Sequence, residues 1–191
     1  MSSILKVDTI QNTSGNDLIT TASNTTSLKN PNGTTGLNID SNGLISIPNR
    51  VAGAFRNSSS QTISNTTSTK IELNSALFNE NVSFDGSSNH RITIQHAGIY
   101  LVNGQVGYHG GAEQAHVGIR LNGSTNASKG LADEWLQNGD SANSSAQVVM
   151  QNCYILTLTA NDYLELWAYH NSGGSMTTHQ NRTYISIVKL A

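Results

Sequence analysis

The sequence has little charge, a single cysteine and no long apolar run. Only 12% of its 191 residues are charged, and the ten basic and twelve acidic side chains form no basic stripe of the kind that binds nucleic acid. No stretch is long enough to span a membrane, and none has helical periodicity. We therefore expect a β-rich protein with no nucleic-acid partner and no membrane insertion.

Cysteine occurs once, at Cys153. One thiol excludes an intrachain disulfide and a cysteine-based zinc site within one chain. A lone cysteine is usually a small buried hydrophobe, and we expect that of Cys153. The opening MSSILKVDTI has no apolar run long enough for a secretory signal, so we expect a soluble protein made in a cytoplasm.

Residues 1–48 form a first segment of short β-like pieces separated by runs rich in Asn, Thr, Ser and Gly. Within it, GLNI and LISIP flank the sequence DSNG, whose Asn42-Gly43 pair is a strong hairpin signal because both residues tolerate positive φ. The segment is too polar to build its own core. Such strands gain stability by packing against copies of themselves, so we predict an extended β-rich stalk or anchor with threefold symmetry.

Residues 51–191 have longer strands with period-two alternation. The sets of residues expected to share a face are Ile71 and Leu73; Ile92 and Ile94; Tyr100, Val102, Val106 and Tyr108; Val117, Ile119 and Leu121; and Leu164, Leu166 and Ala168. The stretch 147–159 is apolar enough to be buried on both faces. About eight strands result, which predicts an all-β antiparallel jelly-roll sandwich.

Several motifs of this second segment resemble one family. The order KIEL, NENVSFD, RITIQHAGIYLVNGQVGY, HVGIRLNG, LTANDYLELWA and YISIVKL is similar to the complement globular-head and tumour-necrosis-factor jelly roll. The most specific element is Ala97-Gly98-Ile99-Tyr100, which matches that family's Pro/Ala-Gly-x-Tyr step. Asn161 stands where the family usually has glycine, and asparagine tolerates the left-handed conformation. The resemblance implies a homotrimer.

Phage fibres carry relatives of this domain, and two further segments resemble phage proteins. GLNIDSNGLISIPNRVAGAF is similar to the junction between stalk and head in tail fibres, and SSILKVDTIQNTSG resembles the start of virion proteins from marine phages. The segment has more aromatic residues than one small core needs. We therefore expect these residues to pack either in the core or at the threefold axis between chains. They are Tyr100, Tyr108, Tyr154, Tyr163 and Trp167.

No catalytic or metal-binding pattern is present. The six histidines contain no HExxH pair, and the carboxylates Asp85, Asp133, Glu134 and Asp140 show no spacing that joins them into a glycosidase pair. We expect no enzyme activity and no cofactor. Calcium at Asp133-Glu134, or a metal held by one histidine from each of three chains, stays open.

Two loops are the predicted binding surface. In an eight-strand jelly roll whose termini lie at the stalk end, Ser124 to Ser145 and Asn171 to Arg182 fall together at the far end. Trp135 beside Asp133 and Glu134 is a combination that stacks on sugars and hydrogen-bonds their hydroxyls, although it can equally fold back onto the domain. His170, Met176 and His179 are the candidates in or near the second loop.

Three functions are consistent with these patterns. The first is a phage virion fibre whose residues 1–48 bind other virion proteins and whose trimeric head contacts a host-surface glycan or protein. The second is a capsid decoration or vertex fibre without a specific receptor. The third is a soluble, host-encoded ligand-binding module, which the absence of a secretory signal disfavours. Under the first two of these functions, the protein is expected to be located in the virion.

Overall fold

The chain forms two compact units, Met1–Arg50 and Val51–Ala191. The computed structural model describes residues 9–22, 24–110, 114–124, 134–137 and 147–191. Both units consist of antiparallel strands, and the described residues contain no α-helix. In the same part of the chain, no helix is long and apolar enough to cross a membrane.

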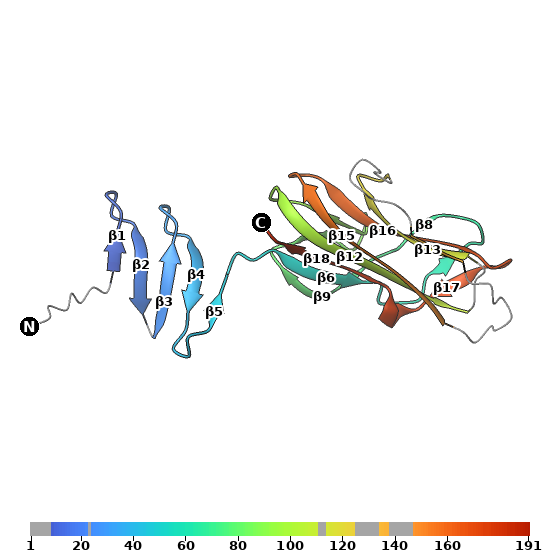
Figure 1. Ribbon diagram of the computed structural model, residues 1–191, viewed down its shortest axis with the longest axis horizontal. Helices are drawn as coiled ribbons and strands as arrows, with labels where there is room; N and C mark the ends of the chain where they lie inside the picture. The colour runs from blue at the N-terminus through green and yellow to red at the C-terminus, as the bar shows by residue number, and fades with distance from the viewer. Residues whose placement is uncertain (1–8, 23, 111–113, 125–133, 138–146) are drawn as a thin grey trace, which may run out of the picture. The chain divides into compact units, whose positions relative to one another are not determined.

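The first unit is a single-layered meander of five strands, drawn in blue in Figure 1. Each strand pairs antiparallel with the next, in the order of the chain. The strands are β1 (Thr9–Gln11), β2 (Asp17–Ala22), β3 (Thr25–Lys29), β4 (Thr35–Ile39) and β5 (Ile45–Ser46).

Three of the meander's connections use the same five-residue turn, at residues 12–16, 30–34 and 40–44. The side-chain oxygen of the first residue, Asn12, Asn30 or Asp40, accepts hydrogen bonds from the amides two and four positions later, at 2.8–3.0 Å. The fourth residue is a glycine with φ of +78° to +80°. An Asx side chain and a left-handed glycine are therefore required at fixed spacing. The hairpin predicted at Asn42-Gly43 is confirmed.

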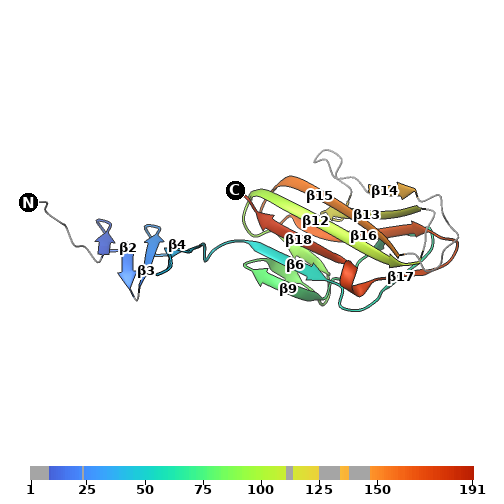
Figure 2. The same cartoon turned by 60° about the horizontal axis from the view of Figure 1, so that its bottom comes forward.

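The second unit, the head, is a sandwich of two sheets, which Figure 2 shows facing one another. The six-stranded sheet has the order β10-β11-β16-β13-β14, with β8 beside β16. It contains β8 (Thr69–Lys70), β10 (Ser83–Asp85), β11 (Arg91–Thr93), β13 (Gln114–Leu121), β14 (Glu134–Gln137) and β16 (Tyr163–Asn171).

The seven-stranded sheet has the order β7-β17-β12-β18-β6-β9, and β15 pairs with the other side of β12. Its strands are β6 (Ala52–Arg56), β7 (Thr62–Ile63), β9 (Ser75–Glu80), β12 (Gly98–His109), β15 (Gln147–Leu158), β17 (Met176–Thr178) and β18 (Tyr184–Lys189). A short 3₁₀ turn, η2 (Gln180–Arg182), precedes β18. The predicted all-β antiparallel jelly roll is confirmed. Short strands such as β7, β8 and β17 raise the strand number above the eight expected.

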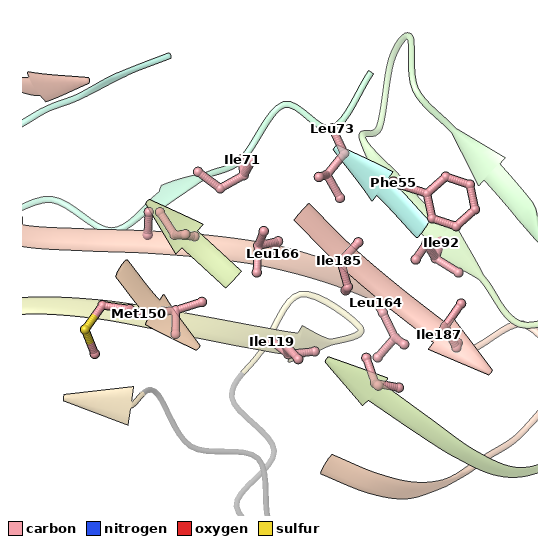
Figure 3. Close-up of a cluster of buried hydrophobic side chains, with 14 of the residues drawn as sticks. Phe55, Ile71, Leu73, Ile92, Ile119, Met150, Leu164, Leu166, Ile185 and Ile187 are labelled. Atoms are coloured by element: carbon pink, nitrogen blue, oxygen red, sulfur yellow. The ribbon is translucent and has the colours of Figure 1, made fainter. Parts of the chain in front are cut away.

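The core lies between the two sheets of the head. Every residue of the sets predicted to share a face is buried there, from Ile71 and Leu73 to Leu164 and Leu166. Figure 3 shows the side chains of the two sheets meeting, with Ile119, Leu164 and Leu166 from one sheet and Phe55, Ile185 and Ile187 from the other. Each such side chain contributes roughly 1.5–3 kcal/mol on leaving water. Among the described residues, every member of this core cluster belongs to the head.

Two predictions about β15 are wrong for the single chain. The strand is buried on one face only, because Ile155 is 67% exposed whereas Leu156 and Leu158 are buried. Cys153 is exposed and lies on the same outward face. A period-two strand at a sheet surface places alternate residues in solvent, so an apolar run need not be buried throughout.

The motif Ala97-Gly98-Ile99-Tyr100 marks a close approach of two backbones. A Cβ atom on Gly98 would overlap the carbonyl oxygen of Ala191. At this point the Ile99 amide donates to the Ala191 carbonyl, and the Leu190 amide donates to the Ile99 carbonyl, both at 2.8 Å. The glycine is required because the Ala191 backbone and the Lys189 side chain fill the space that a Cβ atom would occupy.

Asn161 adopts the left-handed conformation that its substitution for glycine led us to expect, with φ of +73°. We expect Asn161→Val to lower the free energy of unfolding of the head by about 1–2 kcal/mol, since a β-branched residue is strained at this φ. Asn161→Gly should stay within about 1 kcal/mol of the original chain. Urea unfolding measures both variants. Equal stabilities would show that the turn relaxes to another conformation.

Candidate functional site

The outward face of the seven-stranded sheet carries an apolar band. Leu101 of β12 lies opposite Ile155 of β15 on one side and opposite Val188 of β18 on the other. Ile99, on the same face of β12, is 41% exposed, and Ile155 is the most exposed of the four. We call Ile99, Leu101, Ile155 and Val188 the apolar band. Leu101 and Val188 are half-buried, and a cluster of two exposed and two half-buried aliphatic side chains marks a surface that gains stability when another surface covers it.

Beside the band, polar side chains on the same face form hydrogen bonds within the chain. The Gln151 amide donates to the Asn103 side-chain oxygen (2.9 Å). The Tyr184 hydroxyl donates to the Gln105 side-chain oxygen (3.3 Å), and the Gln105 amide donates to the Arg182 carbonyl (3.1 Å). Because these groups already have partners within the chain, a second surface can approach them at a small desolvation cost.

The outward face of the six-stranded sheet has a different chemistry, in which cations cover aromatic rings. The Arg120 guanidinium lies 3.9 Å from the ring centre of Trp167, and that of Arg91 lies 4.3 Å from the ring centre of Tyr163. The Trp167 indole N–H donates to Glu165 (3.2 Å), and Lys70 forms an ion pair with the same carboxylate (3.1 Å). These rings are stabilised within the sheet by cation–π contacts.

The aromatic residues assigned to the core or a threefold axis divide into three groups. Tyr100 and Tyr108 are fully buried in the core of one chain, so they cannot line an axis between chains. Tyr163 and Trp167 lie on the six-stranded sheet, and Tyr154 is half-buried on β15. The correction has a simple reason: sequence alternation showed that Tyr100 and Tyr108 share a face, but not which face.

The Tyr108 hydroxyl is anchored by backbone groups. It donates to the His116 carbonyl (2.7 Å), and the Tyr169 amide donates to it (3.2 Å). Burial raises the pKa of Tyr108 well above its usual value. The hydroxyl therefore stays protonated and joins β12 to the facing six-stranded sheet.

Two of the residues predicted to bind a ligand belong to the interior. His170 is fully buried, where its Nε2 donates to the Ile63 carbonyl (2.9 Å) and its Nδ1 lies 3.0 Å from the Ser172 hydroxyl. Met176 is 7% exposed. Both belong to strands rather than to the predicted loop, and their expected place on a binding surface is corrected to the core.

His179 is the member of that set that reaches the surface. Its ring stacks on His109 with centroids 4.6 Å apart. Its Nδ1 accepts from the Asn181 amide (3.2 Å) and so caps η2. The ring is held in place by this cap, and contact with a ligand stays a prediction.

The predicted long loop, Ser124 to Ser145, contains a strand. Glu134 and Trp135 belong to β14, where Trp135 pairs with His116 of β13. Asp133 and Asp140 lie outside the described residues. Gln137 of β14 and Asn171 of β16 both pair with Gln114, so the two predicted loop regions adjoin the same end of this sheet.

No group of three or more His, Cys, Asp or Glu side chains within the described ranges is placed to hold a metal ion. Asp85, one of the carboxylates considered for glycosidase chemistry, caps a turn by accepting from the amides of Ser87 and Ser88 and from the Asn89 side chain. These hydrogen bonds, the Ser88 amide first, hold the pKa of Asp85 well below its usual value. Its role is structural.

Sequence reasoning did not identify the apolar band. A signal was present, because Ile99 and Leu101 alternate with the core residues Tyr100 and Val102, so that both faces of β12 carry large apolar side chains. The same holds for Ile155 beside Leu156. Apolar residues on both faces of an outer sheet indicate that both faces are to be covered.

Comparison with solved structures identifies the fold of the head. The chain is similar to Eiger TNF from S. frugiperda, at 16% identity over 74% of this chain and 93% of that one, with a TM-score of 0.55. Murine APRIL matches at 13% identity over 74% and 99% of the two chains, with a TM-score of 0.51. The globular domain of zebrafish complement 1qA matches at 16% identity over 74% and 98%, with a TM-score of 0.50.

These likenesses show a jelly roll of the tumour-necrosis-factor and complement globular-head type. No protein-family model matches the sequence, and no curated protein matches it either.

Proposed function

We propose that the protein is a non-enzymatic structural subunit that forms a homotrimer through the apolar band of its head. The observation that carries the proposal is the exposure of Ile155 at the centre of an outward face whose neighbours Ile99, Leu101 and Val188 are also aliphatic. A jelly roll has no need of such a surface for its own core, which is complete between the two sheets. The family that the sequence motifs resemble generally forms trimers, which supports three copies.

The edge of the same sheet supports association as well. In the described part of the chain, β15 is twelve residues long and pairs with β12 alone. A long, uncovered edge strand invites uncontrolled pairing, which proteins avoid by covering the edge. A neighbouring head placed against β15 and the apolar band protects both at once.

In the finer proposal, the trimer is a fibre of a phage particle. The meander attaches it to other virion proteins, and the head contacts a host-surface glycan or protein. Support comes from the division into a polar β-rich unit and a globular head, and from the stalk-to-head motifs of the sequence.

If the head contacts the host surface, purified head added to host cells should compete with adsorption of the particles. Unchanged adsorption, together with particles that are weakened when the protein is missing, favours a capsid decoration role.

The experiment that tests association is the solution mass of two proteins, the full chain and Val51–Ala191, by light scattering. We expect three times the chain mass for each, where the full chain is 20.4 kDa. The head has its own core and is expected to fold without the meander. A monomeric head would overturn the proposal that the apolar band is the site of association.

A further inference from the structure

The meander has one aliphatic face. Ile10 of β1 pairs with Ile19 of β2, Ile19 pairs with Leu28 of β3, and Leu28 pairs with Leu37 of β4. Paired residues point to the same side of a sheet, so these four side chains form a row across four strands. We call Ile10, Ile19, Leu28 and Leu37 the aliphatic row. Beside it on the same face, Ile39 of β4 pairs with Ile45 of β5.

The opposite face of the meander is polar. Its row across the strands consists of Thr9, Thr20, Ser27, Asn38 and Ser46, each paired with the next. Within it, the Ser27 hydroxyl donates to the Asn38 side-chain oxygen (2.6 Å). The two faces therefore differ: the aliphatic row carries no hydrogen-bonding side chain, and the neighbouring pair Thr21 and Thr26 on its face have their hydroxyls 3.4 Å from each other.

A single layer cannot cover its own apolar side. Ile10 is 49% exposed, Leu28 is 42% exposed and Ile45 is 65% exposed. Among the described residues, the buried core cluster begins at Phe55 and includes no residue of the meander. A sheet with short strands and one unburied apolar face is marginal by itself, so the aliphatic row needs a covering surface.

We propose that the covering surface is the same face of other copies of this chain: three meanders turn their aliphatic rows toward a common axis. The inference rests on the proposed trimer of heads. Only residues 47–50 separate β5 from the head, so three associated heads bring three meanders to millimolar effective concentration. At that concentration a modest apolar face associates, and the polar face with its Ser27–Asn38 hydrogen bond stays in water.

The chemistry of the face favours copies over other occupants. The aliphatic row carries no charge and no hydrogen-bonding side chain, so only another apolar surface covers it without leaving polar groups unsatisfied. Every copy carries one such surface. A membrane-binding face would instead be flanked by aromatic and several basic side chains, and among residues 9–46 the one basic residue is Lys29.

The test places a single thiol on either face of the full chain, in a Cys153→Ser background. Leu28→Cys and Ile19→Cys probe the aliphatic row. Ser27→Cys and Thr20→Cys are the matched controls, since each is the chain neighbour of a test residue and lies on the polar face. The rate of reaction with a maleimide reagent and the yield of chain-to-chain cross-links with a bis-maleimide are measured for all four.

The inference predicts that the thiols of the aliphatic row react with maleimide at least about tenfold more slowly than the control thiols, because they are accessible only when the meanders separate. It also predicts that these thiols cross-link between chains, because the rows of different chains face one another. Equal rates and no cross-links, in a protein of three-chain mass, overturn the inference and leave the trimer of heads standing. Protection and cross-linking in a full chain whose Val51–Ala191 part is monomeric support the inference and overturn the head as the site of association.

Discussion

Replacing Ile155 by lysine is expected to convert the head, Val51–Ala191, from a trimer to a monomer and to lower its solution mass threefold. Ile155 is 67% exposed in the single chain and lies opposite Leu101 at the centre of the apolar band. Covering such a side chain contributes roughly 1.5–3 kcal/mol per copy. An unpaired lysine in the same place must be desolvated, which costs several kcal/mol per copy.

Light scattering at equal protein concentration measures this effect, and circular dichroism shows that the variant is folded. Ser68→Lys is the control, because it adds the same charge at an exposed position next to β8 of the other sheet. We expect the control to keep the mass of the original head. Retention of that mass by Ile155→Lys would show that the interface lies elsewhere on the head.

Truncating Tyr108 to alanine is expected to lower the free energy of unfolding of the head by about 3–5 kcal/mol, the range for a large aromatic side chain in a core. The ring is fully buried, and its hydroxyl bonds the backbone at His116 and Tyr169. Tyr108→Phe keeps the ring and removes the hydroxyl, so we expect a loss of about 1–3 kcal/mol.

Denaturant unfolding followed by tryptophan fluorescence gives both values, and light scattering gives the mass under native conditions. Substitution of a core residue is expected to lower the free energy of unfolding and to leave the number of associated chains unchanged. A folded Tyr108→Phe head of normal stability and lower mass would return Tyr108 to an interface between chains. The pair of measurements thus separates the core assignment from the axis assignment.

Local patterns predicted much of the fold because they depend on neighbours in the chain. Alternation gave the sets of residues in β12 and β16 that share a face, since a strand places every second side chain on one face. Asn42-Gly43 gave a hairpin, because the turn at residues 40–44 needs an Asx side chain and a left-handed glycine within five residues. The left-handed conformation of Asn161 was expected from the resemblance, because asparagine stands there in place of the family's glycine.

The interaction surfaces were predicted less well, because each combines residues that are distant in sequence. The apolar band joins Leu101, Ile155 and Val188 from three strands, and the Arg120–Trp167 stack joins two strands across a register that no local pattern contains. The aliphatic row has a sequence signal, because its four members recur every nine residues between Ile10 and Leu37. That spacing becomes informative only once the meander shows that each strand plus its turn is about nine residues long.

The sequence by itself determined the all-β composition, the turn at Asn42-Gly43 and the sets of residues that share a face. Only the tertiary structure decided which of two sets points inward. Tyr108 is part of the core while Ile155 faces solvent, although both lie in apolar strands. The physical reason is that alternation defines two equivalent faces of a strand, and only the packing of the second sheet removes one of them from water.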